Sequence, residues 1–401
     1  RNKKELADKI RSVLKMLKKS KRPVILAGYG IKAAGAEKEF KRLIERLLIP
    51  VLTTRRGADL LPAKDKKYFG RPGTYGQRSA NFIIQNSDLL ISIGARLSLP
   101  LIGRNYKTFA RAAKKVIVDI DPQELDKATV AADLTVLADA GEFTKTLLDS
   151  SEIKELPDRK NWIKCCQKWC KVFSGEKKRR EIDPYHFVKV LSGQLNAKET
   201  VVVDGGVALD FTMQSFRFKT GQRLIASTGL EQPGFALPGS IGVFLVSRPD
   251  RIICLSDTKS LQSNIAELKT IASHKLPIKI FVFNSKTDAP VQSVQETYFG
   301  RRYVGLDQSF DVAKTAKSFG VSTLVVKKNK EMEKSIKQAI TRAGPVLCEV
   351  ALPEDQEMIP RMVFKVTADG RWSSPPLEDM YPFLDRKTLK KNMLIDILEE
   401  E

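Results

Sequence analysis

The chain contains 401 residues, of which 42% are hydrophobic and 29% are charged, and this composition predicts a soluble globular protein of two or three domains. It excludes a helical membrane span, because no run of about 18 consecutive apolar residues occurs. Lysine and arginine number 69 against 47 aspartates and glutamates, so the formal net charge is +22 and an anionic partner, nucleic acid or an acidic protein, is expected. The alternative is a surface whose dispersed lysines serve only solubility.

The cysteine and histidine content points to no metal or nucleophile site. Five cysteines indicate a reducing intracellular compartment, either the cytoplasm or an organelle matrix. Cys165, Cys166 and Cys170 share one predicted helix at a spacing that matches no zinc site, so we expect them to be structural. Neither His186 nor His274 has neighbours typical of a catalytic triad. No signal-peptide pattern is present and the first residue is not Met, which fits a processed chain or a piece of a longer one.

The first part of the chain predicts one α/β domain behind a short helix. Residues 1–20 predict a basic amphipathic helix, because apolar residues recur at helical spacing. Residues 21–150 alternate apolar runs with helical patterns, which predicts a doubly wound domain with a parallel sheet. The expected strands are 22–28, 51–54, 88–94, 115–121 and 134–139, and the expected helices are 34–48, one that opens near residue 79, and 141–149.

Glycines and acids follow several of these strands. Gly28 and Gly30 resemble a dinucleotide-binding turn, but Gly35 is misplaced for the full motif, and a plain β–α turn explains the pair equally well. Other glycines at strand ends would let a ligand approach the backbone, and the acids would suit ribose hydroxyls. These residues are Gly73, Gly76, Gly94, Asp119, Asp121 and Asp139.

The second part of the chain predicts another doubly wound α/β domain. Residues 151–182, which are charged and polar around one helical pattern, are predicted to be a linker. The second domain, residues 183–382, opens with Asp183 as N-cap and Pro184 in the first turn of a helix. The tail, residues 383–401, predicts an amphipathic helix that is exposed or used for assembly. The expected strands are 201–204, 223–226, 252–255, 278–283, 321–326 and 345–351, and the expected helices include 261–273, 310–319 and 330–343.

The stretch 251–292 is the predicted site region. Its two strands are continuous apolar runs, as in a parallel sheet covered on both faces. Polar loops at 256–260 and 284–289 follow their carboxyl ends, where such sheets bind ligands, so the loops should lie side by side. We expect a cofactor site here, or the remains of one.

Several longer segments occur in a specific order, namely RPVILAGYGIKAAGA, FGRPGTYGQRSANFIIQNSDLLISIGARL, VIVDIDPQEL, STGLEQPGFALPGSIG, LQSNIAELKTIASHKLPIKIFVFN and SPPLEDMYPFL. They resemble the thiamine-diphosphate (ThDP) enzymes of the acetolactate-synthase type, and most closely the branch that acts in sugar-nucleotide and polysaccharide pathways. The resemblance covers residues 20–385 almost entirely. It implies a central Rossmann-like domain, which binds FAD in some members, then the domain that holds the ThDP pyrophosphate, and an oligomer.

The resemblance also shows what differs from the family. A pyrimidine-binding domain, whose glutamate activates the thiamine ring, normally precedes these two, and this chain starts where that domain would end. A Gly-Asp-Gly-Ser motif and an Asn-Asn pair normally hold magnesium on the diphosphate. They align with Asp257-Thr258-Lys259-Ser260 and Asn284-Ser285, so Thr258 and Ser285 replace both metal ligands.

Three states of this site follow from the resemblance. It holds no cofactor, or Lys259 neutralises a diphosphate without metal, or both loops slip by one residue so that Asp257 and Asn284 bind magnesium. Further departures are Glu231-Gln232 for a small Gly-Ala pair, and Pro233 for the bulky apolar residue that bends the cofactor. The resemblance implies a vestigial diphosphate site at Gly205, Gly206, Gly229, Gly234, Asp257, Thr258, Lys259, Ser260, Asn284 and Ser285.

The first domain departs less from the family pattern. Its flavin-contact positions correspond to Gly28, Gly30, Gly73, Tyr75, Gly76, Gly94, Arg96, Asp119, Ile120 and Asp139.

We carry three functional hypotheses. The first is a catalytically inactive relative, reused as a binding or structural subunit, with no cofactor. The second is a ThDP- and magnesium-dependent carboligase or decarboxylase that acts on a 2-keto acid such as pyruvate, with the pyrimidine domain supplied elsewhere. The third is an FAD- or nucleotide-binding module that uses only the first domain.

Overall fold

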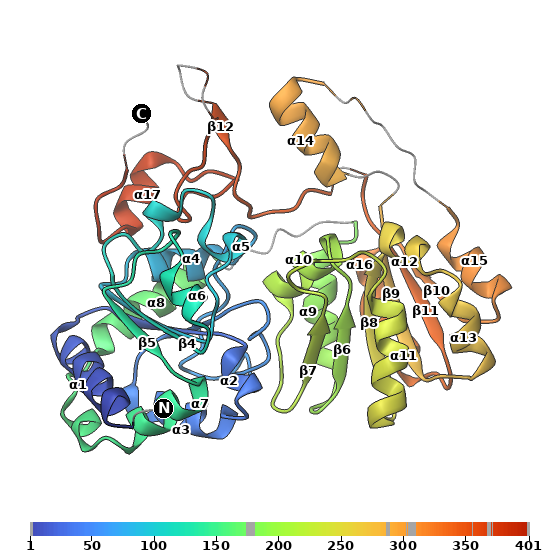
Figure 1. The fold of residues 1–401 in the computed structure, drawn as a ribbon. Helices are drawn as coiled ribbons and strands as arrows, with labels where there is room; N and C mark the ends of the chain where they lie inside the picture. The colour runs from blue at the N-terminus through green and yellow to red at the C-terminus, as the bar shows by residue number, and fades with distance from the viewer. Residues whose placement is uncertain are drawn as a thin grey trace. The chain divides into compact units, whose positions relative to one another are not determined.

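The computed structural model describes residues 3–173, 181–285, 289–301, 303, 310–354, 356–366, 370 and 372–398. The chain divides into two compact units (Figure 1), of which unit 1 comprises Arg1–Gly175 and Ile359–Glu401, and unit 2 comprises Glu176–Met358. In the part of the chain that the structure describes, no helix is long and apolar enough to cross a membrane.

Unit 1 contains a five-stranded sheet in the order β2-β1-β3-β4-β5, in which all neighbouring strands run parallel. β1 and β3 are buried along their whole length, as expected of strands covered on both faces. The predicted doubly wound α/β fold is therefore confirmed for this region. The strands are β1 (Pro23–Ala27), β2 (Val51–Thr53), β3 (Leu89–Ile93), β4 (Lys114–Asp119) and β5 (Leu134–Leu137).

Helices cover both faces of this sheet. On one face, α1 (Lys3–Lys19), α3 (Glu37–Leu47) and α7 (Ala140–Asp149) bury a shared apolar cluster against the strands. On the other face, α4 (Arg78–Gln85) packs against α8 (Lys160–Val172). The short connecting elements are α2 (Gly30–Ala33), α5 (Leu99–Ile102), α6 (Pro122–Asp126) and the 3-10 turns η1 (Tyr106–Thr108) and η2 (Ser151–Glu155).

Helix α8 lies in the stretch that we predicted to be a linker, but it belongs to the core of unit 1. Trp162, Cys166 and Trp169 follow one side of the helix and are all buried. The Trp162 indole N–H donates to the Pro23 carbonyl of β1 at 3.0 Å. The lysines that suggested a linker occupy the opposite, solvent-facing side, so the helix is amphipathic rather than loosely attached.

The C-terminal segment returns to unit 1 after unit 2 is complete. It contains the ribbon of β12 (Lys365–Val366) and β13 (Trp372–Ser373), and then α17 (Arg386–Asn392). Leu389 and Met393 are buried in the same cluster as the tryptophans of α8. This packing differs from the predicted domain end at residue 382 and from an exposed tail over 383–401. The apolar residues of the tail helix face the core of unit 1.

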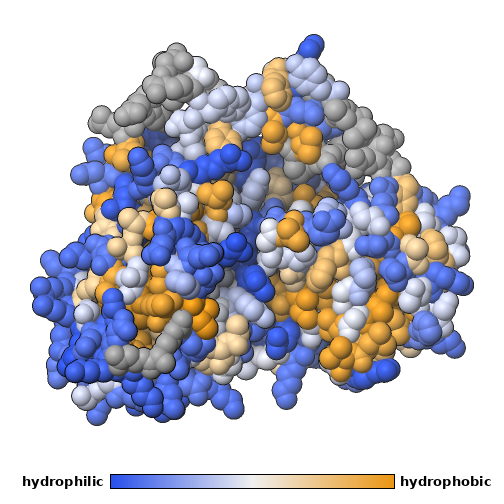
Figure 2. Space-filling view, viewed as in Figure 1, coloured by the Kyte–Doolittle hydropathy of each residue, from blue (hydrophilic) through white to orange (hydrophobic). Residues whose placement is uncertain are grey.

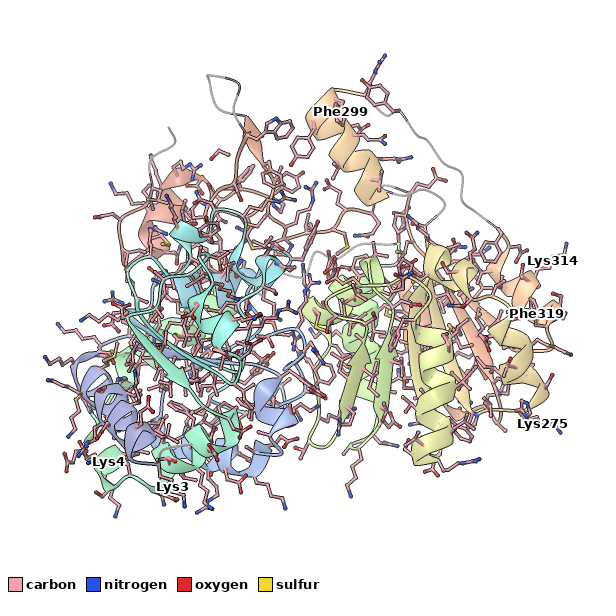
Figure 3. All side chains as sticks on the ribbon, in the orientation of Figure 1. Lys3, Lys4, Lys275, Phe299, Lys314 and Phe319 are labelled. Atoms are coloured by element: carbon pink, nitrogen blue, oxygen red, sulfur yellow. The ribbon has the colours of Figure 1, made fainter. Side chains whose placement is uncertain are left out.

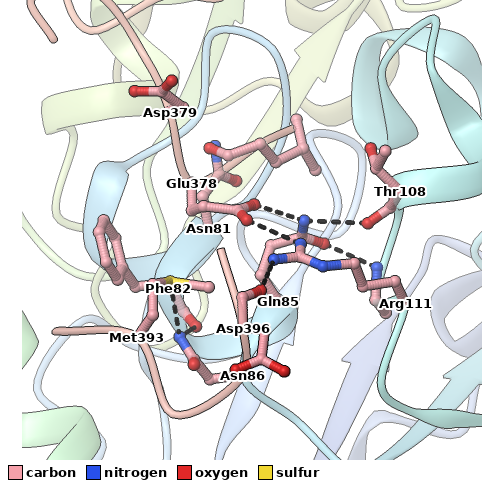
Figure 4. Close-up of polar contacts among 12 residues, drawn as sticks. Asn81, Phe82, Gln85, Asn86, Thr108, Arg111, Glu378, Asp379, Met393 and Asp396 are labelled. Atoms are coloured by element: carbon pink, nitrogen blue, oxygen red, sulfur yellow. Dashed lines mark hydrogen bonds and ion pairs between the residues drawn. The ribbon is translucent and has the colours of Figure 1, made fainter. Parts of the chain in front are cut away.

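Polar side chains of α4 hold this segment in place (Figure 4). Gln85 donates to the Glu378 carboxylate at 2.6 Å, and Arg111 forms an ion pair with the same carboxylate at 2.7 Å. Asn81 donates to the Leu377 carbonyl at 3.0 Å. Asn81, Gln85 and Glu378 are buried, so each of their contacts satisfies a donor or acceptor that water cannot reach, whereas Arg111 is partly buried.

Unit 2 contains a six-stranded, all-parallel sheet in the order β10-β11-β9-β8-β6-β7. Its strands are β6 (Thr200–Val203), β7 (Arg223–Ala226), β8 (Ile252–Asp257), β9 (Ile278–Asn284), β10 (Ser322–Val326) and β11 (Val346–Ala351). Its helices are α9 (Pro184–Gln194), α10 (Val207–Ser215), α11 (Ala236–Ser247), α12 (Thr258–Ser263), α13 (Glu267–Ser273), α14 (Ala289–Phe299), α15 (Val312–Ser318) and α16 (Asn329–Thr341).

Local signals in unit 2 behave largely as the sequence predicted. The Asp183 carboxylate caps α9 by accepting from the Tyr185 N–H at 2.9 Å, which confirms the predicted N-cap.

The surface of unit 2 carries lysines over an apolar core. Lys275 and Lys314 are exposed, whereas Phe319 is partly buried against the core cluster of the unit (Figure 3). The predicted single helix 261–273 is wrong, because α12 begins directly after β8 and α13 follows it separately.

Helix α11 is apolar on almost every side and carries no charged residue. Its core-facing residues pack onto the sheet, but Leu245 is 54% exposed and Val246 is 88% exposed. Leu230, in the loop that leads into the helix, is 89% exposed. Figure 2 shows the resulting hydrophobic surface over α11. A contiguous apolar surface of this kind is typical of an interaction site.

Candidate functional site

The predicted diphosphate site lies at the carboxyl edge of the unit 2 sheet. The strands lie in the order β9-β8-β6; β8 ends at Asp257 and β9 at Asn284, and Asp204 directly follows β6. The starts of the two predicted loops are therefore adjacent, as expected for neighbouring parallel strands, whereas residues 286–288 of the second loop lie outside the described residues. The predicted polar loop 256–260 is wrong in form, because β8 continues to Asp257 and Thr258 already opens α12.

Asp204 is a site residue that the sequence analysis did not single out. It is fully buried and accepts hydrogen bonds from the Ala236 N–H at 2.8 Å and from the Ser256 hydroxyl. Burial raises the pKa of Asp204 to about 6, and the nearby Asp257 carboxylate acts in the same direction. The sequence pattern that could have identified Asp204 is an acid directly after a buried strand and before two glycines.

Thr258 aligns with the metal-binding aspartate of the family, and its hydroxyl is the first member of a series of hydrogen bonds between side chains. It donates to the Asn284 Oδ1 at 2.9 Å. The Asn284 amide nitrogen in turn donates to Glu349 Oε1 at 2.8 Å, and Glu349 Oε2 accepts from the Ala313 N–H at 3.1 Å. The chain of contacts crosses from α12 to β9 and β11, and it uses both ends of the Asn284 amide.

Asp257, which the slipped alternative pairs with Asn284 as a metal ligand, caps a helix in the structure. Its Oδ1 accepts from the Ser260 N–H at 2.9 Å and caps α12. Within the described residues, no group of three or more histidines, cysteines, aspartates and glutamates could hold a metal ion. Lys259 is exposed at the start of α12, and Ser285 follows the last residue of β9.

The loops around the site also pack directly on each other. A Cβ at Gly205 would lie 2.4 Å from the Glu231 carbonyl oxygen, so the loop that carries Glu231 touches the backbone after β6. At Gly234, where φ is +84°, a Cβ would lie 2.7 Å from Ser263 of α12. The predicted glycines Gly206 and Gly229 adopt φ of +75° and +116°. Gly205 and Gly234 are thus explained by contacts within the chain.

These residues do not fit a magnesium diphosphate group. A hard cation needs several free oxygen ligands, whereas the oxygens of Thr258, Asn284 and Asp257 are engaged with each other or with the backbone. In the described residues these contacts join α12 to β9 and cap α12.

The predicted nucleotide site lies at the carboxyl edge of the unit 1 sheet, where the loops after β1 and β3 meet. A Cβ at Gly28 would fall 1.9 Å from the Gly94 carbonyl oxygen, and one at Gly30 would fall 2.7 Å from the Gly94 Cα. A Cβ at Gly73 would fall 2.7 Å from the Pro100 oxygen, and one at Gly76 would fall 2.5 Å from the Gly73 nitrogen. The close approach that these glycines permit is between parts of the chain itself.

The acids predicted for ribose have local structural partners. Asp139 caps α7 by accepting from the Gly141 N–H at 2.8 Å, and Asp121 caps α6. Asp119 accepts from the Asp121 N–H at 3.1 Å.

The side chains left at this edge are apolar, aromatic or cationic. Ile120 is 58% exposed and Tyr75 is 36% exposed, with the Arg55 guanidinium 6.0 Å from the Tyr75 ring. Arg96 pairs with Glu124 at 3.1 Å on the surface.

Comparison with known proteins assigns the two sheets to known domains. Residues 10–147 match the central domain of thiamine pyrophosphate enzymes, and residues 204–350 match their C-terminal, TPP-binding domain. The chain belongs to the thiamine pyrophosphate enzyme family. This confirms the family that the sequence resembles, and it places both candidate sites in matched domains.

The curated relatives are acetolactate synthase large subunits. A probable large subunit of Methanocaldococcus jannaschii is 30% identical over 400 residues, which is 95% of this chain and 67% of that protein. The large subunit of Porphyra purpurea is 30% identical over 86% of this chain and 59% of its own length. That of Cyanidium caldarium is 31% identical over 85% of this chain and 60% of its own length. The chain thus spans about three fifths to two thirds of these thiamine pyrophosphate family relatives.

Proposed function

We propose that this chain is a non-catalytic member of the thiamine pyrophosphate enzyme family that acts through binding and assembly. The observation that carries the proposal is the chain of hydrogen bonds from Thr258 through Asn284 to Glu349, which begins at one of the two metal-ligand positions. The other ligand position, Ser285, directly follows Asn284 in the chain. Family members in general use ThDP and magnesium, so the proposal concerns a loss specific to this chain.

The energetics of this network support the proposal. Asn284 donates to a carboxylate, and a hydrogen bond to a charged group contributes about 1.5–3 kcal/mol. To present Asn284 to a cation, the Thr258 hydroxyl must give up its acceptor at 2.9 Å, and the other acceptor in this buried site, the Phe283 carbonyl, lies at 3.4 Å. Thr258 supplies no negative charge in return, and Lys259 adds a positive charge at the start of α12. A divalent cation is therefore disfavoured on both counts.

The alternative is an active carboligase or decarboxylase whose pyrimidine domain comes from another polypeptide. The family fold and the relatives named acetolactate synthase favour it. In that case ThDP would supply a carbanion for attack on a 2-keto acid. The two proposals differ in whether unit 2 binds ThDP at all.

Calorimetry separates the two proposals. With ThDP and magnesium in large excess, we expect no saturable heat of binding, because the ligand set for the metal is missing. The same result is expected when a pyrimidine-domain fragment of an active acetolactate synthase is added in excess. A Thr258→Asp, Ser285→Asn variant, which restores both ligands of the family, is the matched control and should bind magnesium more tightly than the wild type.

The active-enzyme alternative would hold instead if ThDP bound to the wild-type chain in a magnesium-dependent way. It would also hold if the chain and the pyrimidine-domain fragment together formed acetolactate from pyruvate. Equal magnesium affinity of the wild type and the restored variant would also count against a lost metal site.

The exposed surface of α11 supports a role in assembly. A helix without charges that leaves Leu245 and Val246 in water is costly for a chain that works alone, because burying each side chain would gain about 1.5–3 kcal/mol. We therefore propose that a protein surface, in the first instance that of a second copy, covers this helix.

Sedimentation velocity tests this assembly. The wild type is expected to form dimers or larger species at micromolar concentration, and Val246→Lys should shift it to the monomer, because it places a charge in the buried interface. Val325→Lys, at another exposed valine of unit 2, is the control and should leave the assembly intact. A monomeric wild type, or equal effects of the two substitutions, would refute the assembly.

A further inference from the structure

The solvent side of α8 is a basic face, which we define as Lys160, Lys164, Lys168 and Lys171. All four are exposed, and the helix contains no acidic residue. The opposite side is anchored in the core by its two tryptophans, so the orientation of the lysines is fixed. In sequence, α8 follows the matched residues 10–147 and precedes the matched residues 204–350. The core of unit 1 thus presents a rigid row of lysines.

The spacing of this row is regular. Lys160, Lys164 and Lys168 are four residues apart, so they lie above one another at a rise of about 6 Å per step, because each residue of a helix rises 1.5 Å. Like charges at this spacing repel and weaken the helix. In the described part of the chain, no carboxylate pairs with Lys164 or Lys168 to offset the repulsion. An anion that runs along the helix would remove this cost.

The row continues into a groove between the end of α1 and the start of α8. The groove is lined by five basic residues, Lys18, Lys19, Lys21, Arg159 and Lys160, and by Ser20, Pro157, Asp158, Asn161 and Trp162. It lies at the positive end of the α8 dipole, where backbone N–H groups favour a phosphate.

Arg159 adds a second feature to this groove. It is 5% exposed, and its Nε has no hydrogen-bond partner. The other guanidinium nitrogens donate to the Pro157 and Leu17 carbonyls. Burial lowers the pKa of Arg159 from its usual value, although the nearby Asp88 carboxylate acts in the opposite direction. A phosphate oxygen in the groove would add a second negative charge close to this side chain and could accept from its Nε–H.

The carboxylates nearby do not block the groove. Lys18 pairs with Glu152 at 2.9 Å and with Glu155 at 2.7 Å, and Lys160 pairs with Asp158 at 2.7 Å. These side chains are largely exposed. Exposed ion pairs contribute little to stability, so a phosphate can replace them at small cost.

We propose that the basic face of α8 and the adjoining groove bind the phosphate backbone of a nucleic acid without reading its sequence. The basic face extends along about 16 Å of the helix. Over this length a DNA duplex presents roughly nine phosphate charges, one per 1.7 Å, so each of the lysines can reach a phosphate. Lysine is suited to such contacts, whereas sequence readout and protein interfaces rely more on arginine and aromatic anchors. The face lacks aromatic anchors, since Trp162 and Trp169 are buried. This binding is independent of the ThDP site of unit 2.

Fluorescence anisotropy with a labelled 20-bp DNA duplex tests the proposal. The variant Lys160→Gln, Lys164→Gln, Lys168→Gln is expected to bind at least tenfold more weakly at about 50 mM salt, because three phosphate contacts are lost. Its log–log salt slope should be shallower than that of the wild type by about 2.7, from 0.9 for each contact. The matched variant with arginine at these three positions should retain binding, since the charges remain.

The control removes the same charge from another helix. Lys330→Gln, Lys334→Gln, Lys337→Gln on α16 also lowers the net charge from +22 to +19, at exposed positions. It should bind as the wild type does. Equal losses for the two glutamine variants would show that only net charge acts, and would overturn the proposal. So would an absence of duplex binding by the wild type, or poly-glutamate binding as tightly as the duplex.

Discussion

Replacing Glu378 by alanine is expected to destabilise unit 1 by about 3–5 kcal/mol, because it leaves a buried arginine without its partner. The Glu378 side chain is 1% exposed and that of Arg111 is 15% exposed. The carboxylate accepts from Arg111 at 2.7 Å and from Gln85 at 2.6 Å. Gln85 also accepts from the Ala110 N–H, so the loss would spread into the loop before β4.

Tryptophan fluorescence during urea unfolding measures this effect. The three tryptophans, Trp162, Trp169 and Trp372, all lie in unit 1, so the signal follows that unit. Removing both members of the pair, with Glu378→Met and Arg111→Met, should cost less than Glu378→Ala alone. Asp8→Ala breaks the exposed Asp8–Arg11 pair and should leave the transition unchanged. A wild-type midpoint for Glu378→Ala would contradict a structural role of the C-terminal segment.

Gly28→Ala is expected to cost at least about 3 kcal/mol or to prevent folding of unit 1, at the upper end of the range for overpacking. The new methyl group would lie 1.9 Å from the Gly94 oxygen and 2.3 Å from the Ala95 Cα. Both contacts are with backbone, which cannot move aside as a flexible side chain can. The loops after β1 and β3 would have to separate.

Urea unfolding followed by tryptophan fluorescence measures the loss of stability of unit 1, and Gly35→Ala is the control. Gly35 has φ of +65° but nothing within 4 Å of its would-be Cβ, so only a backbone cost of about 1 kcal/mol is expected. If Gly28→Ala folds with normal stability, the fold does not require a glycine at this position. The glycine would then be better explained by a ligand that binds close to the backbone of this turn. Equal costs for the two variants would refute the contact argument.

Much of the fold could be predicted because its signals are local. Continuous apolar runs predicted the buried parallel strands, and Asp183 before Pro184 predicted the start of α9. The helix α8 was predicted, but its stretch was assigned to a linker because it is rich in lysines, although Trp162, Cys166 and Trp169 mark a buried side. Periodicity was the better guide there than average polarity.

The site could be predicted in position but not in detail. The strand ends gave the place of Thr258 and Asn284, since adjacent parallel strands end together. Glu349, which orients Asn284, lies 65 residues further along the chain in β11, and no sequence pattern connects them. The docking of Glu378 on Gln85 spans 293 residues and was invisible for the same reason.

The return of the C-terminal segment to unit 1 has a consequence for synthesis on the ribosome. Unit 2 is continuous in sequence, from Glu176 to Met358, so all its contacts are available once that stretch has emerged. Unit 1 is interrupted, and Gln85, Asn81 and Asn86 must wait for residues made nearly 300 positions later. Within this chain, unit 1 therefore begins before unit 2 and is completed after it. Until its C-terminal segment has been made, the apolar surface of its incomplete core is open to binding by chaperones.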